Sequence, residues 1–276
     1  MSAGGMSAEE RYLFDLRGYL LVEDVLEPAE VRELNEQLDT LDLWNQPRGQ
    51  DAPLDYETFD ERFFHVSPPH CWGKPFLDVL GHPRMTGYLR EILGPEFRYD
   101  HGQAMFMRKG SGSLELHGGG TPCDPVGFYR VADGAIHCGL TVISYALCDV
   151  GVDDGGFVVV PGSHKSGFPR PEGLLDPEAC RPLLRQVPQR AGSAIIFTEA
   201  LTHGTLPWTA EHERRALLYR YTPGHMAFVG RYRQDGAEQP GWAYPLPSDA
   251  ADADLTPDLR RLLEYPYVSE RDRLPS

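Results

Sequence analysis

Two histidines lie where strand-like segments of the sequence meet loops. His117 ends the segment 114–117 and is followed by three glycines, and His203 follows the apolar segment 193–198. Binding and catalytic residues are often carried where a rigid scaffold meets a loop, and imidazole is the commonest metal ligand in proteins. The pair is therefore a candidate metal site, although either histidine taken alone is better explained as a hydrogen-bonded structural residue.

Two further features accompany these histidines. Arg214 lies eleven positions after His203, at the start of the strand-like segment 216–221. The segment 147–164 contains a strand, a turn with two glycines and the tetrapeptide PGSH at its end. Together, over roughly residues 10–225, these features resemble the phytanoyl-CoA dioxygenase family of non-haem iron, 2-oxoglutarate-dependent oxygenases.

The resemblance implies a set of cofactors and a role for individual residues. His117 and His203 resemble the iron-binding histidines of the family, and Fe(II), 2-oxoglutarate and O2 are the implied cofactors. Arg214 resembles the residue that grips a carboxylate of 2-oxoglutarate, and Thr205 matches a hydroxyl that often contacts the same carboxylate. An arginine suits this role because its planar guanidinium donates two parallel hydrogen bonds to a carboxylate.

Gly119 departs from the family pattern. The family places an iron-binding aspartate two residues after the first histidine, and a glycine cannot replace the carboxylate of a two-histidine, one-carboxylate iron site. Iron/2-oxoglutarate halogenases carry glycine or alanine at this position, and chloride occupies the coordination position that the side chain vacates. The His-x-Gly sequence resembles that pattern, so our main interpretation is an oxidative C–H functionalisation of a small molecule by halogenation, with chloride as an additional ligand.

A hydroxylase with a relocated carboxylate is the first alternative. Glu115 lies two residues before His117 and shares its strand face, Asp124 could fold back from the glycine-rich loop, and Glu199 lies four residues before His203. A water molecule could also fill the third position. Each carboxylate also has a structural explanation, as a surface residue, a turn former and an acceptor for loop amides respectively.

A catalytically silent metabolite-binding protein is the second alternative. Loss of a ligand lowers metal affinity, which is what drift toward inactivity would produce. The presence of both histidines and of Arg214 at the family spacing argues against it.

Other charged residues near these segments have simpler explanations. We interpret His164 as a residue that fixes its loop by a hydrogen bond, and Lys165 as structural as well. Arg215 is expected to be solvated or salt-bridged, because successive strand residues point to opposite faces. Arg108, Lys109 and Arg130 either contact an anionic group of the substrate or are solvated.

The elements that would position the site are predicted by hydrophobic spacing and turn residues. A helix is expected from Pro28 through Leu41, another from Pro83 to the Gly94-Pro95 stop, and a third after Thr256. Residues 44–72 show no sustained period and are predicted to form a loop. Short strands with turn residues between them are expected at 103–107, 114–117, 136–147, 157–160, 193–198 and 216–221.

Such strands, without helices between them, predict a mainly β protein of the α+β kind, a double-stranded β-helix or cupin-like jelly roll with flanking N-terminal helices. The 276 residues are expected to form one domain, with a helical part at about 1–96, a jelly-roll core at about 97–230 and an extension at 231–276. The site should lie in the open mouth of the barrel.

Composition narrows the function classes. The formal net charge of −15 disfavours nucleic acid as a partner and leaves a small-molecule substrate, which could be anionic. The sequence contains no run of about 18 apolar residues, so no membrane span is expected, and the first residues do not resemble a secretory signal. Five cysteines, an odd number without a CxxC pair, favour reduced thiols and a cytoplasmic protein.

Overall fold

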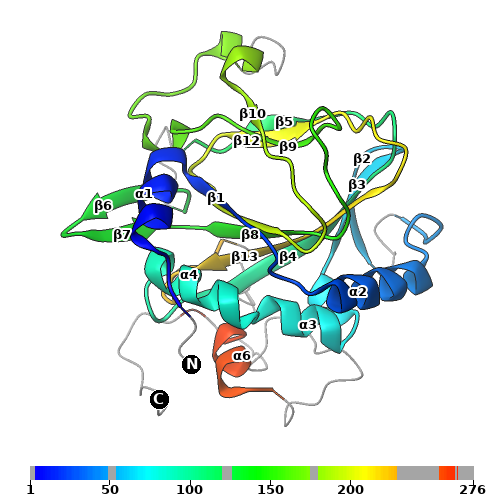
Figure 1. Cartoon of the computed structure of the whole chain (residues 1–276), viewed down its shortest axis with the longest axis horizontal. Helices are drawn as coiled ribbons and strands as arrows, with labels where there is room; N and C mark the ends of the chain where they lie inside the picture. Colours follow the sequence, from blue (N-terminus) through cyan, green and yellow to red (C-terminus); the bar gives the residue numbers. More distant parts are fainter. Residues whose placement is uncertain are drawn as a thin grey trace, which may run out of the picture.

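Two antiparallel sheets face each other in the computed structural model (Figure 1), which describes residues 4–48, 54–119, 126–174, 180–228, 255–264 and 266. The larger sheet has seven strands and the smaller one four, and a two-stranded hairpin extends to one side. In spatial order, the larger sheet consists of β1 (Tyr19–Val22), β11 (Ala194–Thr198), β8 (Thr141–Ala146), β13 (Arg214–Thr222), β4 (Arg98–Met107), β3 (Phe63–Ser67) and β2 (Asp55–Asp60). The smaller sheet consists of β10 (Arg185–Gln186), β9 (Gly156–Val159), β12 (His203–Leu206) and β5 (Leu114–His117), and the hairpin of β6 (Tyr129–Ala132) and β7 (Ala135–Cys138).

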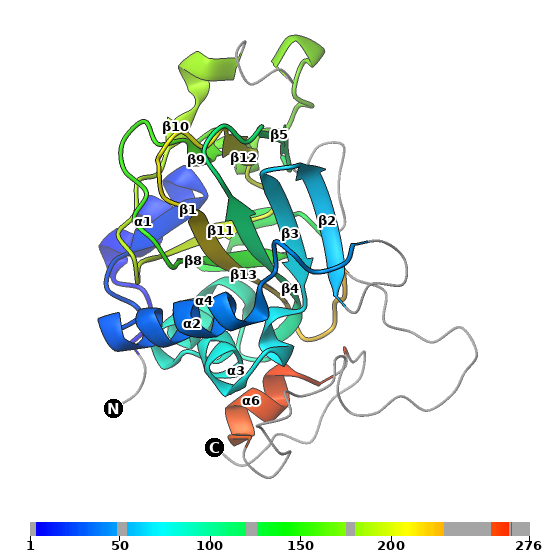
Figure 2. The ribbon, with the colours of Figure 1, turned by 90° about the vertical axis from the view of Figure 1, so that its right-hand side faces the viewer.

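Helices cover the outer face of the larger sheet (Figure 2). They are α2 (Pro28–Leu41), α3 (Lys74–Leu80), α4 (Pro83–Leu93) and α6 (Pro257–Leu262), while α1 (Ala8–Arg17) lies beside β1. Their termini follow the sequence signals. Pro83 opens α4 and Gly94 closes it with a positive φ of 89°, and the Thr256 hydroxyl caps α6 by accepting a hydrogen bond from the Leu259 N–H.

Alternation along the strands divides the interior into two cores. On β8, Val142 belongs to the cluster between the two sheets, whereas Ile143 belongs to the cluster under the helices. On β9, Phe157 and Val159 point between the sheets and Val158 points to the outer face of the smaller sheet. These parities define which side chains of each strand point into the space between the sheets, here called the inner face.

Most predicted elements are confirmed, and the differences have physical reasons. The expected helices correspond to α2, α4 and α6, and each predicted strand segment contains at least one strand. The prediction of a loop at 44–72 was wrong, because β2 and β3 form there and extend the larger sheet. β2 is polar and mostly exposed, so it has no apolar period, and β3 is buried on both faces, so it shows no alternation. The N-terminal part therefore contributes β1, β2 and β3 to the jelly roll as well as helices.

None of the helices within the described ranges is long and apolar enough to cross a membrane.

Candidate active site

The two predicted metal histidines are direct cross-strand neighbours in the smaller sheet. His203 on β12 pairs with His117 on β5, and their ring centroids are 4.1 Å apart. Because His203 also pairs with the inner-face residue Val159, both rings lie on the inner face, with His203 buried and His117 exposed at the mouth. The sheet register thus brings together two residues that are far apart in the sequence.

Backbone carbonyls fix the tautomer of both rings. His117 Nδ1 is 2.9 Å from the Glu115 carbonyl oxygen, and His203 Nδ1 is 2.8 Å from the Leu201 carbonyl oxygen. Since a carbonyl only accepts, each Nδ1 carries the proton and donates it, which leaves each Nε2 with a free lone pair. Burial lowers the pKa of His203 to about 4, so this ring is neutral at pH 7 and able to bind a metal.

Glu199 completes the cluster. It follows β11, and one Oε lies 3.6 Å from His203 Nε2. Potential ligand atoms of His117, Glu199 and His203 all lie within 4.8 Å of one another, the distance range of a site that could hold a metal ion. The other Oε accepts a hydrogen bond of 3.2 Å from Arg220 Nε. Burial alone would raise the pKa of Glu199, but the nearby His203, Arg220 and His117 lower it, so the group is a carboxylate.

The other two candidate carboxylates are not part of this cluster. Glu115 is exposed, and only its carbonyl oxygen contacts His117. Asp124 lies outside the described residues. Of the three relocated carboxylates considered from the sequence, the structure brings Glu199 to the histidines.

Gly119 does not open a space that faces the cluster. It has a φ of +85°, and a Cβ built on it would lie 2.8 Å from Thr202 Oγ1. A Cβ on Gly118 would lie 2.5 Å from the Leu201 carbonyl oxygen, so this part of the loop has no room for a side chain. A side chain at position 119 would thus begin beside Thr202.

Arg214 is a buried cation without an anionic partner. Its side chain lies on the inner face at the start of β13, with 2% of its surface exposed. Its Nη1 contacts the sulfur atoms of Met105 and Met107, and Nε has no hydrogen-bond partner. Burial lowers the pKa of Arg214 to about 10, and no carboxylate in the described part of the chain forms an ion pair with it. An unpaired buried charge is costly in free energy, so the predicted role of Arg214 as the contact of an anionic ligand is consistent with its surroundings.

Thr205 lies on the same side as His203, two residues further along β12. Its Oγ1 accepts a hydrogen bond of 2.8 Å from the Leu114 N–H, which leaves the hydroxyl proton free to donate. Both predicted contacts of 2-oxoglutarate, Arg214 and Thr205, therefore belong to the inner face and retain unused donors.

A cavity of about 330 Å³ opens beside the cluster of candidate metal ligands. Its lining includes His117, Glu199, Arg220, His101, Gln103 and Phe228. Arg220 Nη1 donates to Gln103 Oε1 at 3.1 Å, so a polar chain leads from Glu199 into β4. Arg220 and Gln103 were not predicted from the sequence. An even number of residues separates Arg220 from Arg214 on β13 and Gln103 from Met105 on β4, so both side chains point to the inner face.

His65 is a further inner-face residue that the sequence analysis missed. It pairs with Met105 in the sheet and is 3% exposed, and neither ring nitrogen makes a hydrogen bond. Nδ1 lies 3.4 Å from Glu57 Oε2, too poorly placed to count as a hydrogen bond. The apolar residues around His65, at 63–66, could have indicated a buried strand, but the segment was predicted to be a loop.

The remaining charged residues have structural partners. His164 Nε2 lies 3.0 Å from the Asp15 carbonyl oxygen, which confirms the predicted loop-fixing role, and Lys165 pairs with the Asp15 carboxylate at 2.6 Å. Arg108 and Lys109 form ion pairs with Glu213 and Glu211. Arg130 is exposed on β6, and a contact of these three cations with substrate stays a prediction.

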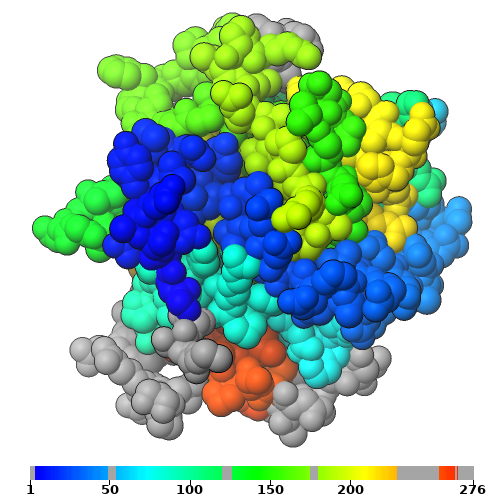
Figure 3. Space-filling view, in the orientation of Figure 1, coloured from blue at the N-terminus to red at the C-terminus, as the bar shows by residue number. Residues whose placement is uncertain are grey.

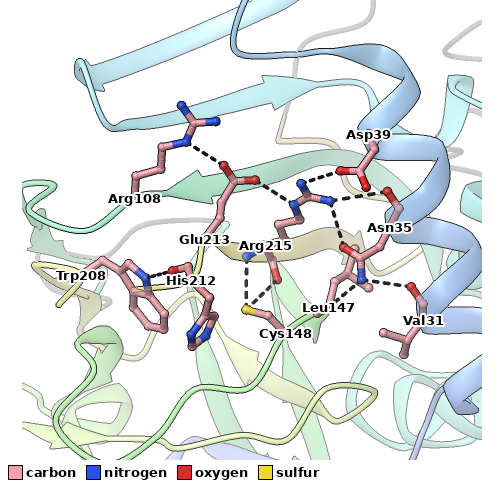
Figure 4. Close-up of polar contacts among 10 residues, drawn as sticks. All are labelled: Val31, Asn35, Asp39, Arg108, Leu147, Cys148, Trp208, His212, Glu213 and Arg215. Carbon is pink, nitrogen blue, oxygen red and sulfur yellow. Dashed lines mark hydrogen bonds and ion pairs between the residues drawn. The ribbon is translucent and has the colours of Figure 1, made fainter. Parts of the chain in front are cut away.

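Arg215 is salt-bridged, as expected (Figure 4). Its guanidinium donates to Glu213 at 2.8 Å, to Asp39 at 2.7 Å and to the Asn35 side chain at 3.2 Å. This network ties α2 to the outer face of β13.

Comparison with known proteins identifies the family. The sequence matches the phytanoyl-CoA dioxygenase family over residues 14–216. The chain belongs to this family. This membership confirms the predicted enzyme class, an Fe(II)/2-oxoglutarate-dependent oxygenase.

Similar proteins agree with this assignment. The ectoine dioxygenase of Nocardia farcinica is 24% identical over 231 residues, which cover 73% of each chain. HygX from Streptomyces hygroscopicus, solved with nickel, 2-oxoglutarate and hygromycin B, has a TM-score of 0.69 at 24% identity, covering 80% of this chain and 89% of HygX. EctD from S. alaskensis, solved with 2-oxoglutarate and 5-hydroxyectoine, has a TM-score of 0.62 at 21% identity, covering 81% and 78%.

These findings confirm the predicted jelly roll and agree with iron, 2-oxoglutarate and O2 as cofactors of this phytanoyl-CoA dioxygenase family member. They give no support to halogenation or to chloride as a ligand, and the hydroxylase alternative fits better. The physical reason lies in the site itself, because the Glu199 carboxylate lies at the two histidines.

Proposed function

We propose that this chain hydroxylates a C–H bond of a small molecule, with Fe(II) bound by His117, Glu199 and His203. The observation that carries this proposal is the position of the Glu199 carboxylate, which provides the two-histidine, one-carboxylate ligand set that Gly119 cannot provide. When bound, Fe(II) with 2-oxoglutarate and O2 supplies the oxidant for the C–H bond.

The protein's own groups prepare this ligand set. The two Nδ1–H groups donate to backbone carbonyls, which leaves the Nε2 lone pair of each ring for the metal. Arg220 holds one carboxylate oxygen of Glu199, which leaves the other beside His203. Such outer partners orient metal ligands and typically change metal affinity about 10–100-fold when removed.

The co-substrate side is formed by Arg214 and Thr205. Arg214 would neutralise a carboxylate of 2-oxoglutarate in a water-poor space between the sheets, where charge-assisted hydrogen bonds are strong. Thr205 has a hydroxyl proton to add, since its oxygen already accepts from the backbone.

Hydroxylation is favoured over halogenation by charge and by geometry. Fe(II) held by two neutral histidines needs an anion, and a chloride would supply it in a halogenase. Here the Glu199 carboxylate supplies the negative charge, and a side chain at position 119 would point toward Thr202. Neither feature leaves a coordination position reserved for chloride.

Anaerobic titration with Fe(II) and 2-oxoglutarate, with and without chloride, tests the proposal. The visible charge-transfer band of the chelate is expected to appear and to be indifferent to chloride. Glu199→Gln keeps the shape but removes the charge, and we expect Fe(II) binding to be weaker by about 100-fold or more, at or above the upper end of the range for outer partners. Glu115→Gln is the matched control and should bind Fe(II) normally.

Three outcomes would contradict the proposal. A band that shifts with chloride would return chloride to the coordination sphere, and unchanged Fe(II) affinity in Glu199→Gln would remove Glu199 from the ligand set. Absence of any band would favour a metabolite-binding protein.

A further inference from the structure

A second cavity, of about 360 Å³, lies on the other face of the smaller sheet. It is lined in part by residues of the segments 160–174 and 180–183, which follow β9 and which Figures 1 and 3 show in green to yellow-green at the top of the molecule. The residues that matter for its chemistry are Val160, Phe168, Arg170, Leu183, Thr202 and Gly119. This cavity is distinct from the one beside the candidate metal ligands, because the two share no lining residue.

The mouth of this cavity exposes large apolar side chains. Phe168 is 82% exposed and Leu183 49% exposed. The backbone of Phe168 is held locally, since the Ser166 hydroxyl donates to the Phe168 carbonyl oxygen and accepts from the Phe168 N–H. Apolar side chains at the mouth of a cavity provide a surface for the apolar part of a ligand.

Arg170 lies inside the cavity with unused donors. Its Nη2 donates to the Leu116 carbonyl oxygen at 2.7 Å, which anchors the side chain to β5. Its Nε and Nη1 are buried and have no partner in the part of the chain that the structure describes. Buried donors of a charged group are costly to leave unpaired, so this arrangement is suited to an oxygen anion from outside the chain.

The nearest thiol does not neutralise Arg170. Cys180 lines the same cavity, and burial raises its pKa even though Arg170 opposes this effect. The thiol therefore stays uncharged at pH 7. Arg108 and Lys109, by contrast, already have carboxylate partners, so they are weaker candidates for an anion site than Arg170.

The floor of the cavity is the backbone that carries the metal ligands. Thr202 directly precedes His203, and Gly119 lies two residues after His117. The Thr202 N–H donates to Ser163 Oγ at 2.8 Å, which fixes this floor to the PGSH turn. Gly119 lets the loop approach Thr202 closely, because a Cβ at this position would lie only 2.8 Å from Thr202 Oγ1.

We propose that this cavity binds a small organic carboxylate with an apolar body, its carboxylate on Arg170 and its body between Val160, Phe168 and Leu183. The site is independent of the proposed hydroxylation, because it needs neither the metal nor 2-oxoglutarate.

Calorimetric titration of the metal-free protein with hexanoate tests this site. We expect saturable binding to the wild-type protein, and binding about tenfold weaker or more in Arg170→Gln, since a charge-assisted contact is lost. Arg170→Lys keeps the charge and should retain part of the affinity. Arg185→Gln, an exposed arginine on β10, is the matched control and should bind normally.

A second variant and two further probes separate the contribution of the apolar mouth from that of the charge on Arg170. Leu183→Asp places a negative charge at the exposed mouth without touching Arg170, and it should weaken hexanoate binding as well. Hexylamine, which has the same body and the opposite charge, should not bind, and 1-hexanol should bind more weakly than hexanoate. No hexanoate binding at millimolar concentration, or equal binding in wild type and Arg170→Gln, would overturn the proposal, whatever the result of the Fe(II) titration.

Discussion

Arg214 and Arg215 are adjacent residues on β13, yet their surroundings are opposite. Arg215 points to the outer face and donates to two carboxylates and an asparagine, which connect it to α2 (Figure 4). Arg214 points to the inner face, where its neighbours are methionine sulfur atoms and one donor is unpaired. The charge of Arg215 is paired within the fold, whereas that of Arg214 has no anionic partner among the described residues, which is why we propose a ligand for it.

This difference extends to the two sides of the larger sheet. On the outer side, three buried tyrosine hydroxyls donate to backbone carbonyl oxygens: Tyr145 to Val79, Tyr219 to Phe76 and Tyr221 to Leu80. On the inner side, Arg214 and His65 are buried with unused hydrogen-bonding atoms. Unsatisfied buried polar groups lower stability, so a fold retains them where they serve binding.

The largest effect is expected for Arg214→Leu. It removes charge-assisted hydrogen bonds worth about 1.5–3 kcal/mol each, so 2-oxoglutarate should bind the Ni(II)-loaded protein about 100-fold more weakly. The free energy of unfolding of the metal-free variant should stay equal or rise, because an unpaired buried charge is removed. Calorimetry and urea unfolding measure the two quantities.

Arg215→Leu is the matched control for this comparison. It should leave 2-oxoglutarate affinity unchanged and lower the free energy of unfolding by about 1 kcal/mol, as partly exposed ion pairs do. A further probe is 2-oxovalerate, which lacks the distal carboxylate: the wild type should discriminate against it, and Arg214→Leu should not. A large loss of stability in Arg214→Leu with normal 2-oxoglutarate binding would reverse the comparison.

His164, in the turn after β9, offers a second test of a residue whose hydrogen bond is made within the fold. His164 is buried and its pKa is lowered to about 4 by burial, against an unfolded value of about 6.5. The folded state therefore takes up this proton less readily than the unfolded state, and stability is lost as pH falls from about 6.5 toward 4. At pH 5 the loss attributable to His164 should be about 2 kcal/mol.

His164→Gln should remove that part of the pH dependence. The stability difference between wild type and His164→Gln should shrink between pH 7 and pH 5, as followed by urea unfolding of metal-free protein. An unchanged difference would mean that His164 is protonated as easily in the folded state as in the unfolded one. The Fe(II) affinity at pH 7 should be unaffected, which separates His164 from the metal histidines.

Sequence reasoning located the strand-end histidines because they follow recognisable strands. It also predicted opposite faces for Arg214 and Arg215 from the period of two residues. Glu199 was one of three candidates, since choosing among them requires the turn between β11 and β12, which sequence spacing does not encode. His65 was missed because β2 is polar and β3 is buried on both faces, so neither strand shows alternation.

The smallest effect is expected for His65→Phe. The ring packs edge-on against Phe59 and Phe63, with centroids 4.8 and 5.5 Å away, so phenylalanine fits the same aromatic cluster. Burial lowers the pKa of His65, and its neutral ring keeps two nitrogens without hydrogen bonds. The free energy of unfolding should therefore rise by about 1 kcal/mol when these nitrogens are removed.

The same variant decides whether His65 serves ligand binding, as we propose for Arg214, or supports the fold, as Arg215 does. If it belongs to the inner, ligand-binding class, greater stability should be accompanied by weaker 2-oxoglutarate binding to the Ni(II)-loaded protein. Glu57→Gln alters only the partly exposed neighbour and should change neither quantity by more than about 0.5 kcal/mol. A loss of stability in His65→Phe would instead show that the 3.4 Å contact with Glu57 supports the fold, and His65 would then join the structural class.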